Sequence, residues 1–482
     1  MTVDVLEDYT NKIIKAYKDA EQKNSTTITI KPPKRSLIWK DERVKEQNKM
    51  KNQAKYDYRA SNTATNKNAL NREHKTLTRI MSKVRKEIFR GDMTKITLEK
   101  DMSRLTKYAK NGKMKEVGLI KDATGSLATS PEAAIDALCK AHFPDARNMT
   151  SECVSDYIRT SNQRIGAKSP KTYNWITAEI IGKAINSFKN NKAPGLDGIT
   201  PNILKLSGNT AIDSLKLLFE MQITLQYTPS LLRTSKVAFI GKADKDDYTL
   251  PKSFRPISLT PFIFKLLERV GSWYIIHKTL KENPLNKRQH AYRTGKLTES
   301  AISQVINQVE KGLLNRSYTL ACFIDISSAF DRLDPDKAIK ALIDKGIPKS
   351  IALWYKDYLK MRFLSITIKG ITVRKCTSIG CPQGGVLSTI LWNVAFDNLL
   401  NLFNNDRVIC VGYADDGSLL LSHDNLPYLF LRLNEALTRC QNWATEFVPI
   451  LARRQQLKLC TSNQNKKIGG ITLDSYLRTA LV

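Results

Sequence analysis

The sequence contains few of the patterns that mark zinc-binding, secreted or membrane proteins. Its eight cysteines include no Cys-x-x-Cys pair and its five histidines show no His-Glu-x-x-His spacing. This argues against a zinc finger and leaves no pattern for Ser-His-Asp or Cys-His catalysis. Cys322 and Cys410 lie inside apolar runs and are expected to be buried free thiols, which fits an intracellular, reducing compartment. No apolar run approaches the roughly 18 residues of a membrane-spanning helix. The acidic residues 1–8 lack the basic and apolar regions expected of a signal peptide.

Acidic residues are scarce relative to basic ones, since 46 Asp and Glu stand against 77 Lys and Arg for a net charge of +31. A charge of this size indicates a polyanionic partner, most simply nucleic acid. A membrane surface would require a basic amphipathic anchor or a lipidation motif, and neither stands out, so no membrane partner is expected. The 482 residues are enough for roughly two to four domains or subdomains.

The N-terminal part of the chain holds about half of this excess charge. Residues 31–120 carry 25 Lys and Arg against 10 Asp and Glu, a net of +15. The apolar residues in this stretch recur at the spacing of one helix face, at Leu77, Ile80, Met81, Val84 and Ile88. The pattern predicts long basic helices that either contact nucleic acid or form a solvated linker, and the sequence leaves both open. Residues 1–170 are therefore predicted to be a basic, mostly α-helical N-terminal extension.

Capping and turn signals predict the elements that follow. Residues 122–125 have the composition of a hairpin-type turn, and Ser130 followed by proline and glutamate marks a helix start. Residues 144–170 are rich in Asn, Ser and Thr and are predicted to be a loop-rich boundary. A second globular region is predicted to open with a helix over residues 177–189.

Two loops carry residues suited to nucleic acid. Residues 189–201 form a compact loop with two glycines and two prolines, from which Lys192 could hold a phosphate backbone. A plain helix–helix connection is the simpler interpretation of this loop. In residues 289–296, Tyr292 could stack on a base and Arg293 could pair with phosphate, although the signal is weak.

A β-hairpin is predicted over residues 235–258. Pro256 near its end favours an edge strand, because proline cannot donate to the ladder. Lys242 and Arg255 could project from this flap toward one ligand. Arginine gives a fork of contacts to phosphate oxygens and lysine supplies a point charge.

Three carboxylates stand at predicted strand ends. Residues 319–326 are an apolar run interrupted by Asp325 alone, as in a buried strand whose end carries a ligand group. Residues 408–421 read as a hairpin whose tip presents Asp415 and Asp416. Taken singly, each has a plainer explanation. A buried acid paired with lysine explains Asp325 as well as a catalytic role does, and an exposed acidic turn explains Asp415 and Asp416 better than a metal site does.

The loop between these acids changes that balance. Residues 378–388 form a glycine- and proline-containing loop that opens an apolar helix, and a helix N-terminus favours phosphate. A strand-end acid, such a loop and an Asp-Asp hairpin together suit two-metal phosphoryl or nucleotidyl transfer, in which carboxylates hold two Mg²⁺ ions.

The ordered set of motifs resembles reverse transcriptases of non-long-terminal-repeat (LINE-type) retrotransposons over about residues 175–443. In chain order the motifs are Lys-Ala-Pro-Gly-Leu-Asp-Gly-Ile at 192–199, Phe-Arg-Pro-Ile-Ser-Leu at 254–259, Gln-His-Ala-Tyr-Arg at 289–293, Phe-Ile-Asp at 323–325 with Ala-Phe-Asp at 329–331, Pro-Gln-Gly at 382–384 and Tyr-Ala-Asp-Asp at 413–416. Each motif alone is weak, whereas the ordered set is strong.

The resemblance implies an α+β right-hand polymerase with fingers and a palm that has a ferredoxin-like βαββαβ core. The implied division is a fingers-like part at 171–318, a palm at 319–446, and an atypical or truncated C-terminal segment at 447–482 with a short or missing thumb.

The implied activity is RNA-directed DNA polymerisation, in which a primer 3′-OH attacks a deoxynucleoside triphosphate. Asp325, Asp415 and Asp416 would be the catalytic acids and would bind two Mg²⁺ ions. The implied partners are an RNA template, a DNA primer or target DNA, and dNTPs, and the implied place of action is the nucleus.

The same resemblance assigns the nucleotide pocket. Lys242 and Arg255 would contact the triphosphate, and Gln383 and Gly384 would line the nucleotide and template pocket. Phe330 would be the wall that excludes a ribose 2′-OH and so favours deoxynucleotides.

The chain departs from the family pattern in the second half of the palm and beyond. Residues 387–389, Leu-Ser-Thr, have threonine where proline is usual, and residues 447–454 lose the expected glycine, turn and lysine. We expect no full thumb, upstream endonuclease or downstream Cys/His knuckle in this sequence. A catalytically inactive nucleic-acid-binding remnant therefore stays open as the alternative. An RNA-templated RNA polymerase fits the bulky Phe330 poorly.

Overall fold

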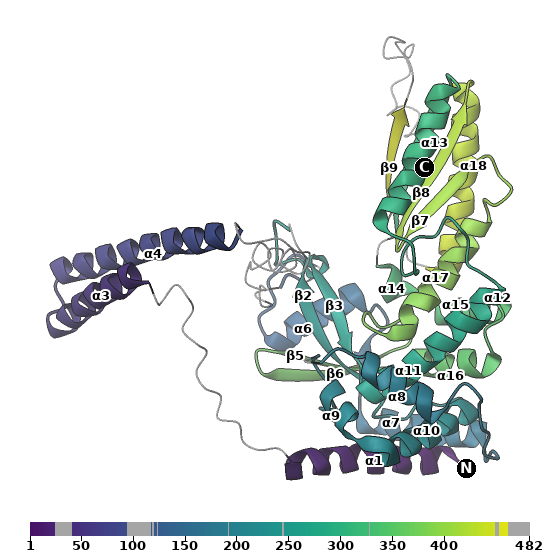
Figure 1. Ribbon diagram of the computed structural model, residues 1–482, viewed down its shortest axis with the longest axis horizontal. Coiled ribbons are helices and arrows are strands. Elements are labelled where there is room, and N and C mark those ends of the chain that lie inside the picture. The colour runs from purple at the N-terminus through teal and green to yellow at the C-terminus, as the bar shows by residue number, and fades with distance from the viewer. Residues whose placement is uncertain are drawn as a thin grey trace. The chain divides into compact units, whose positions relative to one another are not determined.

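A computed structural model describes most of the chain (Figure 1). The described residues are 1–24, 41–93, 117, 120–122, 124–190, 192–242, 245–326, 328–448 and 453–460. For residues 24, 85, 86, 88–93 and 453–460 only the backbone is described. The chain divides into two compact units, residues 1–23 with 115–482, and residues 24–114.

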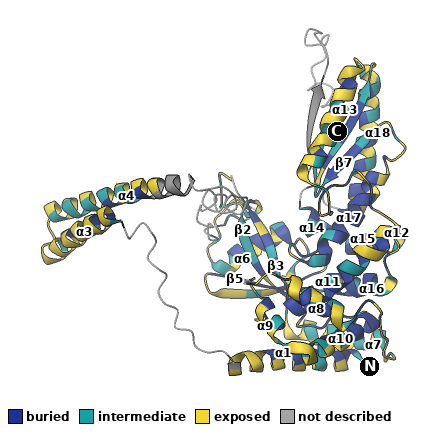
Figure 2. Cartoon of the chain, in the orientation of Figure 1, coloured by how far each residue is buried: buried dark blue, intermediate teal, exposed yellow. Residues whose placement is uncertain are grey.

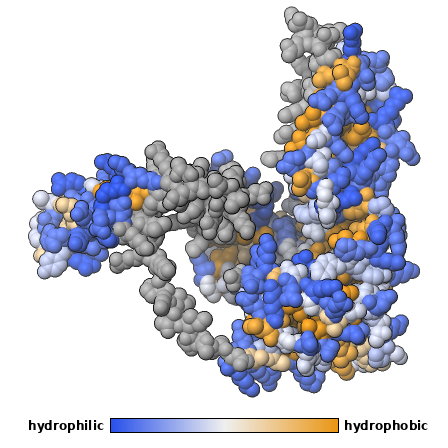
Figure 3. All heavy atoms as spheres, viewed as in Figure 1, coloured by the Kyte–Doolittle hydropathy of each residue, from blue (hydrophilic) through white to orange (hydrophobic). Residues whose placement is uncertain are grey.

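The smaller unit contains two paired helices, α3 (Glu42–Ala60) and α4 (Ala64–Met93). Val44 of α3 forms one apolar cluster with Leu77 and Val84 of α4. The predicted long helices are confirmed, and their apolar faces cover each other. Most of their remaining surface is exposed and hydrophilic (Figures 2 and 3).

One sheet of the larger unit is mixed and five-stranded. Its strands are β1 (Arg147–Asn148), β2 (Thr234–Gly241), β3 (Phe254–Leu259), β5 (Arg362–Ile368) and β6 (Ile371–Thr377), in the order β1-β6-β5-β2-β3. Strand β2 runs parallel to β5, and the other neighbours are antiparallel. The predicted β2–β3 hairpin is confirmed, and Pro256 lies on the edge strand β3, as expected.

Helix α6 (Pro131–His142) packs against this sheet, where Ile135 and Leu138 share a core with Val237 and Leu364. Its predicted start is confirmed, because the Ser130 side chain accepts a hydrogen bond from a backbone N–H in the first turn.

The second sheet is antiparallel and four-stranded. Its strands are β4 (Tyr318–Ile326), β7 (Ile409–Tyr413), β8 (Asp416–His423) and β9 (Arg453–Cys460), in the order β7-β8-β4-β9. Alternate residues of β4 face opposite sides, as strand geometry requires. Ala321 and Phe323 pack with helix α13 (Thr298–Leu314), while Leu320 and Cys322 face the main core together with α17 (Val386–Asn401) and α18 (Leu426–Phe447).

The main core is otherwise built from helices. They are α1 (Val3–Asn24), α7 (Ser151–Ile165), α8 (Ala178–Ser187), α9 (Pro201–Leu206), α10 (Gly208–Leu225), α11 (Phe262–Tyr274), α12 (Leu280–Glu282), α14 (Ala329–Arg332), α15 (Pro335–Asp344) and α16 (Lys349–Lys360). A π-helical turn at Ile275–Thr279 follows α11, and a 3-10 turn at Pro251–Ser253 lies between β2 and β3. None of the described helices is long and apolar enough to cross a membrane. The chain is therefore an α+β protein.

Helix α7 corrects the prediction of a loop-rich boundary over residues 144–170. Thr150 caps its first turn by accepting a hydrogen bond from Cys153 N. Tyr157, Ile158 and Ile165 lie against the main core at helical spacing. The many polar residues that suggested a loop occupy the exposed face of an amphipathic helix.

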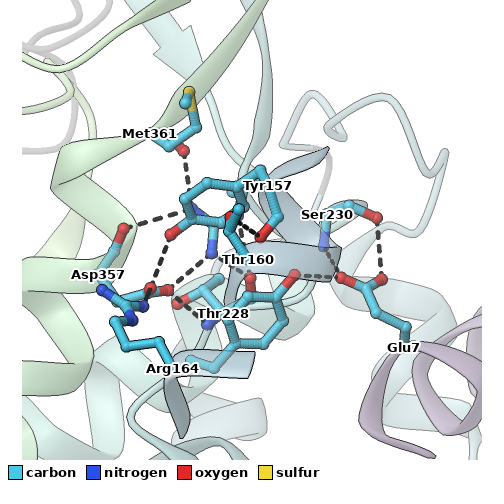
Figure 4. A network of polar contacts seen from close by, with 10 residues as sticks. Glu7, Tyr157, Thr160, Arg164, Thr228, Ser230, Asp357 and Met361 are labelled. Atoms are coloured by element: carbon cyan, nitrogen blue, oxygen red, sulfur yellow. Dashed lines mark hydrogen bonds and ion pairs between the residues drawn. The ribbon is translucent and has the colours of Figure 1, made fainter. Parts of the chain in front are cut away.

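A buried polar network joins α1 and α7 to the start of β2 (Figure 4). The Arg233 guanidinium is fully buried and pairs with Asp357 at 2.7 Å. The Tyr157 hydroxyl donates to the same carboxylate at 2.7 Å. In α1, Glu7 accepts hydrogen bonds from Tyr227 and Ser230. Because each of these buried charges has a partner, the network fixes α1 to the rest of the larger unit.

Candidate active site

Asp325 and Asp416 are direct partners across the β4–β8 ladder. Directly opposite residues in antiparallel strands project to the same face of the sheet, with Cβ atoms about 5 Å apart. By alternation along β4, this is the face of Ala321 and Phe323 that α13 partly covers. The register alone thus brings two predicted acids together.

The third acid lies in the β7–β8 turn. Tyr413 pairs with Asp416, so only Ala414 and Asp415 form the loop. Ala414 has a φ of 56°, the left-handed conformation of a tight hairpin. The predicted hairpin is confirmed, but the expectation of both acids at its tip is corrected. Asp415 is in the turn, whereas Asp416 begins β8.

Backbone hydrogen bonds hold this turn against the neighbouring elements. The carbonyl of Asp415 accepts from Ile326 N at 3.2 Å, and the carbonyl of Ala414 accepts from the Trp392 indole at 2.8 Å. The turn is therefore joined to the end of β4 and to α17, which fixes Asp415 beside the strand that carries Asp325.

The acids interact electrostatically. Burial raises the pKa of Asp415, and the charge of Asp325 raises it further, whereas Arg255 and Lys242 act in the opposite direction. Burial also raises the pKa of Asp416, with added repulsion from Asp415 and Asp325. Such a set of carboxylates is stabilised by a nearby cation.

Lys242 and Arg255 of the β2–β3 flap face these acids. Arg255 is paired in register with Ile240 of β2, and Lys242 N donates to Ser253 O at 2.8 Å. Burial and the neighbouring Arg255 lower the pKa of Lys242, while the carboxylates of Asp331 and Asp325 raise it. The predicted flap cations and the predicted acids thus lie within electrostatic reach of each other.

Gln383 and Gly384 lie against the edge strand of the same flap. The Gln383 carbonyl accepts from Ser258 N at 2.8 Å, and its side-chain amide donates to Asp331 at 2.8 Å. Gly384 has a φ of +116°, and a Cβ there would lie 2.9 Å from Ser258 O. Only glycine fits this close approach without strain.

Phe330 and Tyr292 meet near the acids. The Phe330 ring lies edge-on to Tyr292 with centroids 6.3 Å apart, and 5.7 Å from Trp392. Burial raises the pKa of the Tyr292 hydroxyl, and the charge of Asp415 adds to the effect. Both aromatic residues therefore belong to the surroundings of the Asp415 turn.

Arg293 and Lys192 are placed differently. Arg293 donates to the backbone carbonyls of Asn286 and Gln289 at 2.6 and 3.2 Å, so its guanidinium supports its own loop. Lys192 is exposed on the loop that precedes α9. The same loop packs closely on the start of α11, because a Cβ on Gly195 would lie 2.8 Å from Pro261 N.

The N-terminus of α17 corrects another expectation. Glu268 of α11 is fully buried, and its carboxylate accepts hydrogen bonds from Val386 N at 3.1 Å and Leu387 N at 3.2 Å. An internal carboxylate therefore occupies the helix end that the sequence suggested for phosphate. Burial raises the pKa of Glu268 to about 7, against the lowering effect of these backbone donors.

Three buried residues at this site were not predicted, namely His142, Glu268 and Asp331. Asp331 belongs to a quoted motif, and a second acid six positions after Asp325 was the signal available. His142 and Glu268 reach the site only through contacts between distant parts of the chain.

The predicted metal ligands suit a hard divalent cation by their chemistry. Mg²⁺ prefers carboxylate oxygens, and the negative charges of Asp325, Asp415 and Asp416 repel one another, which a cation would relieve. Among the described residues, however, no three His, Cys, Asp or Glu side chains are positioned closely enough to hold a metal ion.

The region that contains the three acids is similar to known proteins. Residues 240–453 match the family described as "Reverse transcriptase (RNA-dependent DNA polymerase)". The chain is 25% identical over 313 residues to "RNA-directed DNA polymerase from mobile element jockey" of Drosophila melanogaster, covering 63% of this chain and 33% of the relative. It is 25% identical over 394 residues to "Probable RNA-directed DNA polymerase from transposon BS" of the same organism, covering 78% and 43%.

A further relative is "Probable RNA-directed DNA polymerase from transposon X-element" of Drosophila melanogaster, 30% identical over 213 residues and covering 44% of this chain and 23% of the relative. The chain thus spans less than half the length of these curated relatives.

Proposed function

We propose that this chain, whose residues 240–453 match the reverse transcriptase (RNA-dependent DNA polymerase) family, carries the RNA-directed DNA polymerase of a non-long-terminal-repeat retrotransposon. The proposed reaction joins a deoxynucleotide to a primer 3′-OH on an RNA template and releases pyrophosphate. Its proposed partners are an RNA template, a DNA primer or target DNA, and dNTPs, and its proposed place of action is the nucleus.

One observation carries this proposal. Asp325 and Asp416 are opposite each other on two paired strands, and the backbone carbonyl of Asp415 accepts a hydrogen bond from the end of β4. The charges of Lys242 and Arg255 act on these acids. Acids beside basic residues on a separate flap match the needs of nucleotidyl transfer, because the triphosphate is itself strongly anionic.

Each acid has a proposed role as a ligand of two Mg²⁺ ions. When bound, these ions would lower the pKa of the attacking hydroxyl and offset the charge of the reacting phosphate. The protein's own contribution is to hold Asp325, Asp415 and Asp416 together on β4 and the β7–β8 hairpin that pairs with it. The raised pKa values of Asp415 and Asp416 support a role in which a cation relieves their repulsion.

The flap and its neighbours would bind and orient the nucleotide. Lys242 and Arg255 would contact the triphosphate, with arginine giving paired contacts to phosphate oxygens. Gln383 and Gly384 would line the base and template side of the pocket. Phe330, held between Tyr292 and Trp392, would limit the room beside the sugar.

The sheet topology supports the polymerase architecture. Strands β4, β7, β8 and β9 lie in the order β7-β8-β4-β9. The connection from β4 to β7 contains helices α14–α17 and the β5–β6 hairpin, and α18 connects β8 to β9. This order is the one expected of a ferredoxin-like βαββαβ palm. We propose residues 319–446 as the palm and residues 171–318 as a fingers-like part. Residues 1–170 would be an N-terminal extension, of which residues 24–114 form the smaller unit, whereas α1, α6 and α7 belong to the larger unit.

The segment after α18 favours an active enzyme over a decayed remnant. Although its sequence departs from the family pattern, β9 pairs with β4 over its whole length and lies opposite Asp325. The strand that carries the first acid therefore has a neighbour on each side. Lys192, Tyr292 and Arg293 remain proposed nucleic-acid contacts.

Primer extension tests the proposal. The purified chain with Mg²⁺, a DNA primer annealed to RNA and dNTPs is expected to lengthen the primer, and Asp415→Asn is expected to abolish this. An intact protein that binds the primer–template duplex but never extends it would favour the inactive remnant.

A further inference from the structure

His142 links three parts of the molecule from a position ahead of the family match. It is the last residue of α6 and is only 4% exposed. Its Nε2 lies 3.0 Å from the carbonyl oxygen of Pro251, in the turn of the β2–β3 flap. Its Nδ1 lies 3.4 Å from Asp331 Oδ2, and its ring packs 5.8 Å from that of Phe239 on β2.

Asp331 connects this histidine to the nucleotide pocket. It is 5% exposed and follows Phe330 directly in α14. While Oδ2 faces His142, Oδ1 accepts a hydrogen bond from the Gln383 side chain at 2.8 Å. The Gln383 side chain is therefore oriented by a carboxylate whose other oxygen faces the histidine.

The donor and acceptor chemistry shows why histidine suits this position. Pro251 offers only a carbonyl acceptor and Asp331 offers a carboxylate, so each ring nitrogen faces an acceptor. The two nitrogens lie on different edges of one rigid ring, so a single side chain reaches both partners. A ring placed between a flap and a palm residue in this way restricts their relative motion.

The flap that His142 holds also carries the phosphate-binding cations of the proposed function. Lys242 N donates to Ser253 O at 2.8 Å, two residues beyond Pro251 in the same turn. Arg255 lies two residues further on, in β3. A contact at Pro251 thus acts on the segment between the two cations. The charge of Asp331 also acts on Lys242, which places this acid close to the flap cation.

We propose that His142 is a positioning residue for the incoming nucleotide: it fixes the β2–β3 flap through Pro251 and orients Gln383 through Asp331. This inference rests on the proposed polymerase function. It extends the nucleotide site to a side chain outside the matched family region. The alternative is that His142 only stabilises the packing of α6 on the first sheet.

A split between KM and kcat distinguishes these roles. In dNTP incorporation on a primed RNA template, His142→Ala is expected to raise the KM for dNTP about tenfold and to change kcat less than about twofold. Cys139→Ala is the matched control, because Cys139 is buried on the same helix in the apolar core of the first sheet, whereas the polar contacts to Pro251 and Asp331 come from His142. This control is expected to leave the KM for dNTP unchanged.

Two conservative variants separate the contact with Asp331 from the contact with Pro251. The amide nitrogen of His142→Asn can replace Nδ1 toward Asp331, and that of His142→Gln can replace Nε2 toward Pro251. Each is expected to reverse part of the KM increase predicted for His142→Ala. Asp331→Asn combined with His142→Ala is expected to cost less than the product of the two single effects, because both variants break the same link.

A readout without catalysis completes the test. Lys252 is exposed in the flap turn, next to Pro251. Trypsin is expected to cleave after Lys252 several-fold faster in His142→Ala than in the wild type or Cys139→Ala, because the turn is released.

If the wild type polymerises and neither the KM nor the cleavage rate changes in His142→Ala, the inference is overturned while the polymerase stands. If the wild type does not polymerise, the proposed function fails, and the cleavage rate alone decides whether His142 holds the flap.

Discussion

Glu268 and Leu387 are separated by 119 positions, yet the fully buried carboxylate of Glu268 accepts a hydrogen bond from Leu387 N at 3.2 Å. Together with the bond from Val386, this contact fixes the first turn of α17 behind the Gln383 loop. A charged group in the apolar core thus supports the geometry of the proposed nucleotide pocket.

This contact predicts how stability depends on pH. Burial raises the pKa of Glu268 from 4.5 to about 7, so the folded state holds this proton more tightly than the unfolded chain. The stabilising contribution is complete below about pH 4.5, falls as the pH rises to about 7, and then stays constant, a difference of roughly 3 kcal/mol. Urea unfolding of the wild type is therefore expected to show lower stability at pH 8 than at pH 5 from this group.

Glu268→Gln removes the titration and serves as the comparison. The amide keeps one acceptor for the backbone of α17, so the variant is expected to fold with a smaller loss of stability between pH 5 and pH 8. An equal pH dependence in the two proteins would show that Glu268 is not the responsible group.

The close approach at Gly384 predicts that alanine destabilises the fold more at this position than at another glycine with a positive φ. Gly384→Ala combines a φ of +116° with a Cβ 2.9 Å from Ser258 O, whereas Gly370→Ala, at a φ of +84°, meets nothing within 4 Å. We expect Gly384→Ala to lose about 1–3 kcal/mol more in the free energy of unfolding than Gly370→Ala. We also expect a higher KM for dNTP in Gly384→Ala alone. Equal stability of the two variants would contradict the contact.

The position of Phe330 predicts its effect on sugar selectivity. Phe330→Val removes a ring held against Tyr292 and Trp392, which opens space beside the sugar. The ratio of kcat/KM for ribonucleotides to that for deoxynucleotides is expected to rise about tenfold or more. Single-nucleotide incorporation with matched rNTP and dNTP measures this ratio, and unchanged selectivity would remove Phe330 from this role.

The exposed lysines of α3 predict a salt dependence that distinguishes a nucleic-acid contact from a linker. Each lysine–phosphate contact contributes about 0.9 to the slope of log affinity against log salt on duplex DNA. Replacing the exposed Lys49 and Lys55 by glutamine is expected to reduce this slope by about 1–2 if α3 contacts the duplex. Binding titrations at several salt concentrations measure it, and an unchanged slope would identify a linker.

Local patterns predicted much of the fold because their signals lie within a few residues of one another. The Ser130 cap, the strand that ends at Asp325 and the hairpin over β7 and β8 are examples. Helix α7 was missed because its apolar face is narrow and its polar residues dominate the composition.

Contacts between distant residues were beyond the reach of such patterns. His142 and Asp331 are 189 positions apart, and Glu268 and Val386 are 118 apart. Their partners are set by how the sheets and helices pack. The register that places Asp325 opposite Asp416 likewise follows from strand pairing, which the sequence motifs suggested only through the family resemblance.

The most direct test of the account is single-dNTP incorporation on a primed RNA template by the wild type, Asp325→Asn and Asp424→Asn. Asp424 is an exposed acid just beyond β8 and serves as the matched control. We expect incorporation by the wild type, activity within about twofold of it in Asp424→Asn, and a loss of at least about a thousandfold in Asp325→Asn. Equal activity in Asp325→Asn and Asp424→Asn, or no incorporation by a wild type that binds the duplex, would contradict the account.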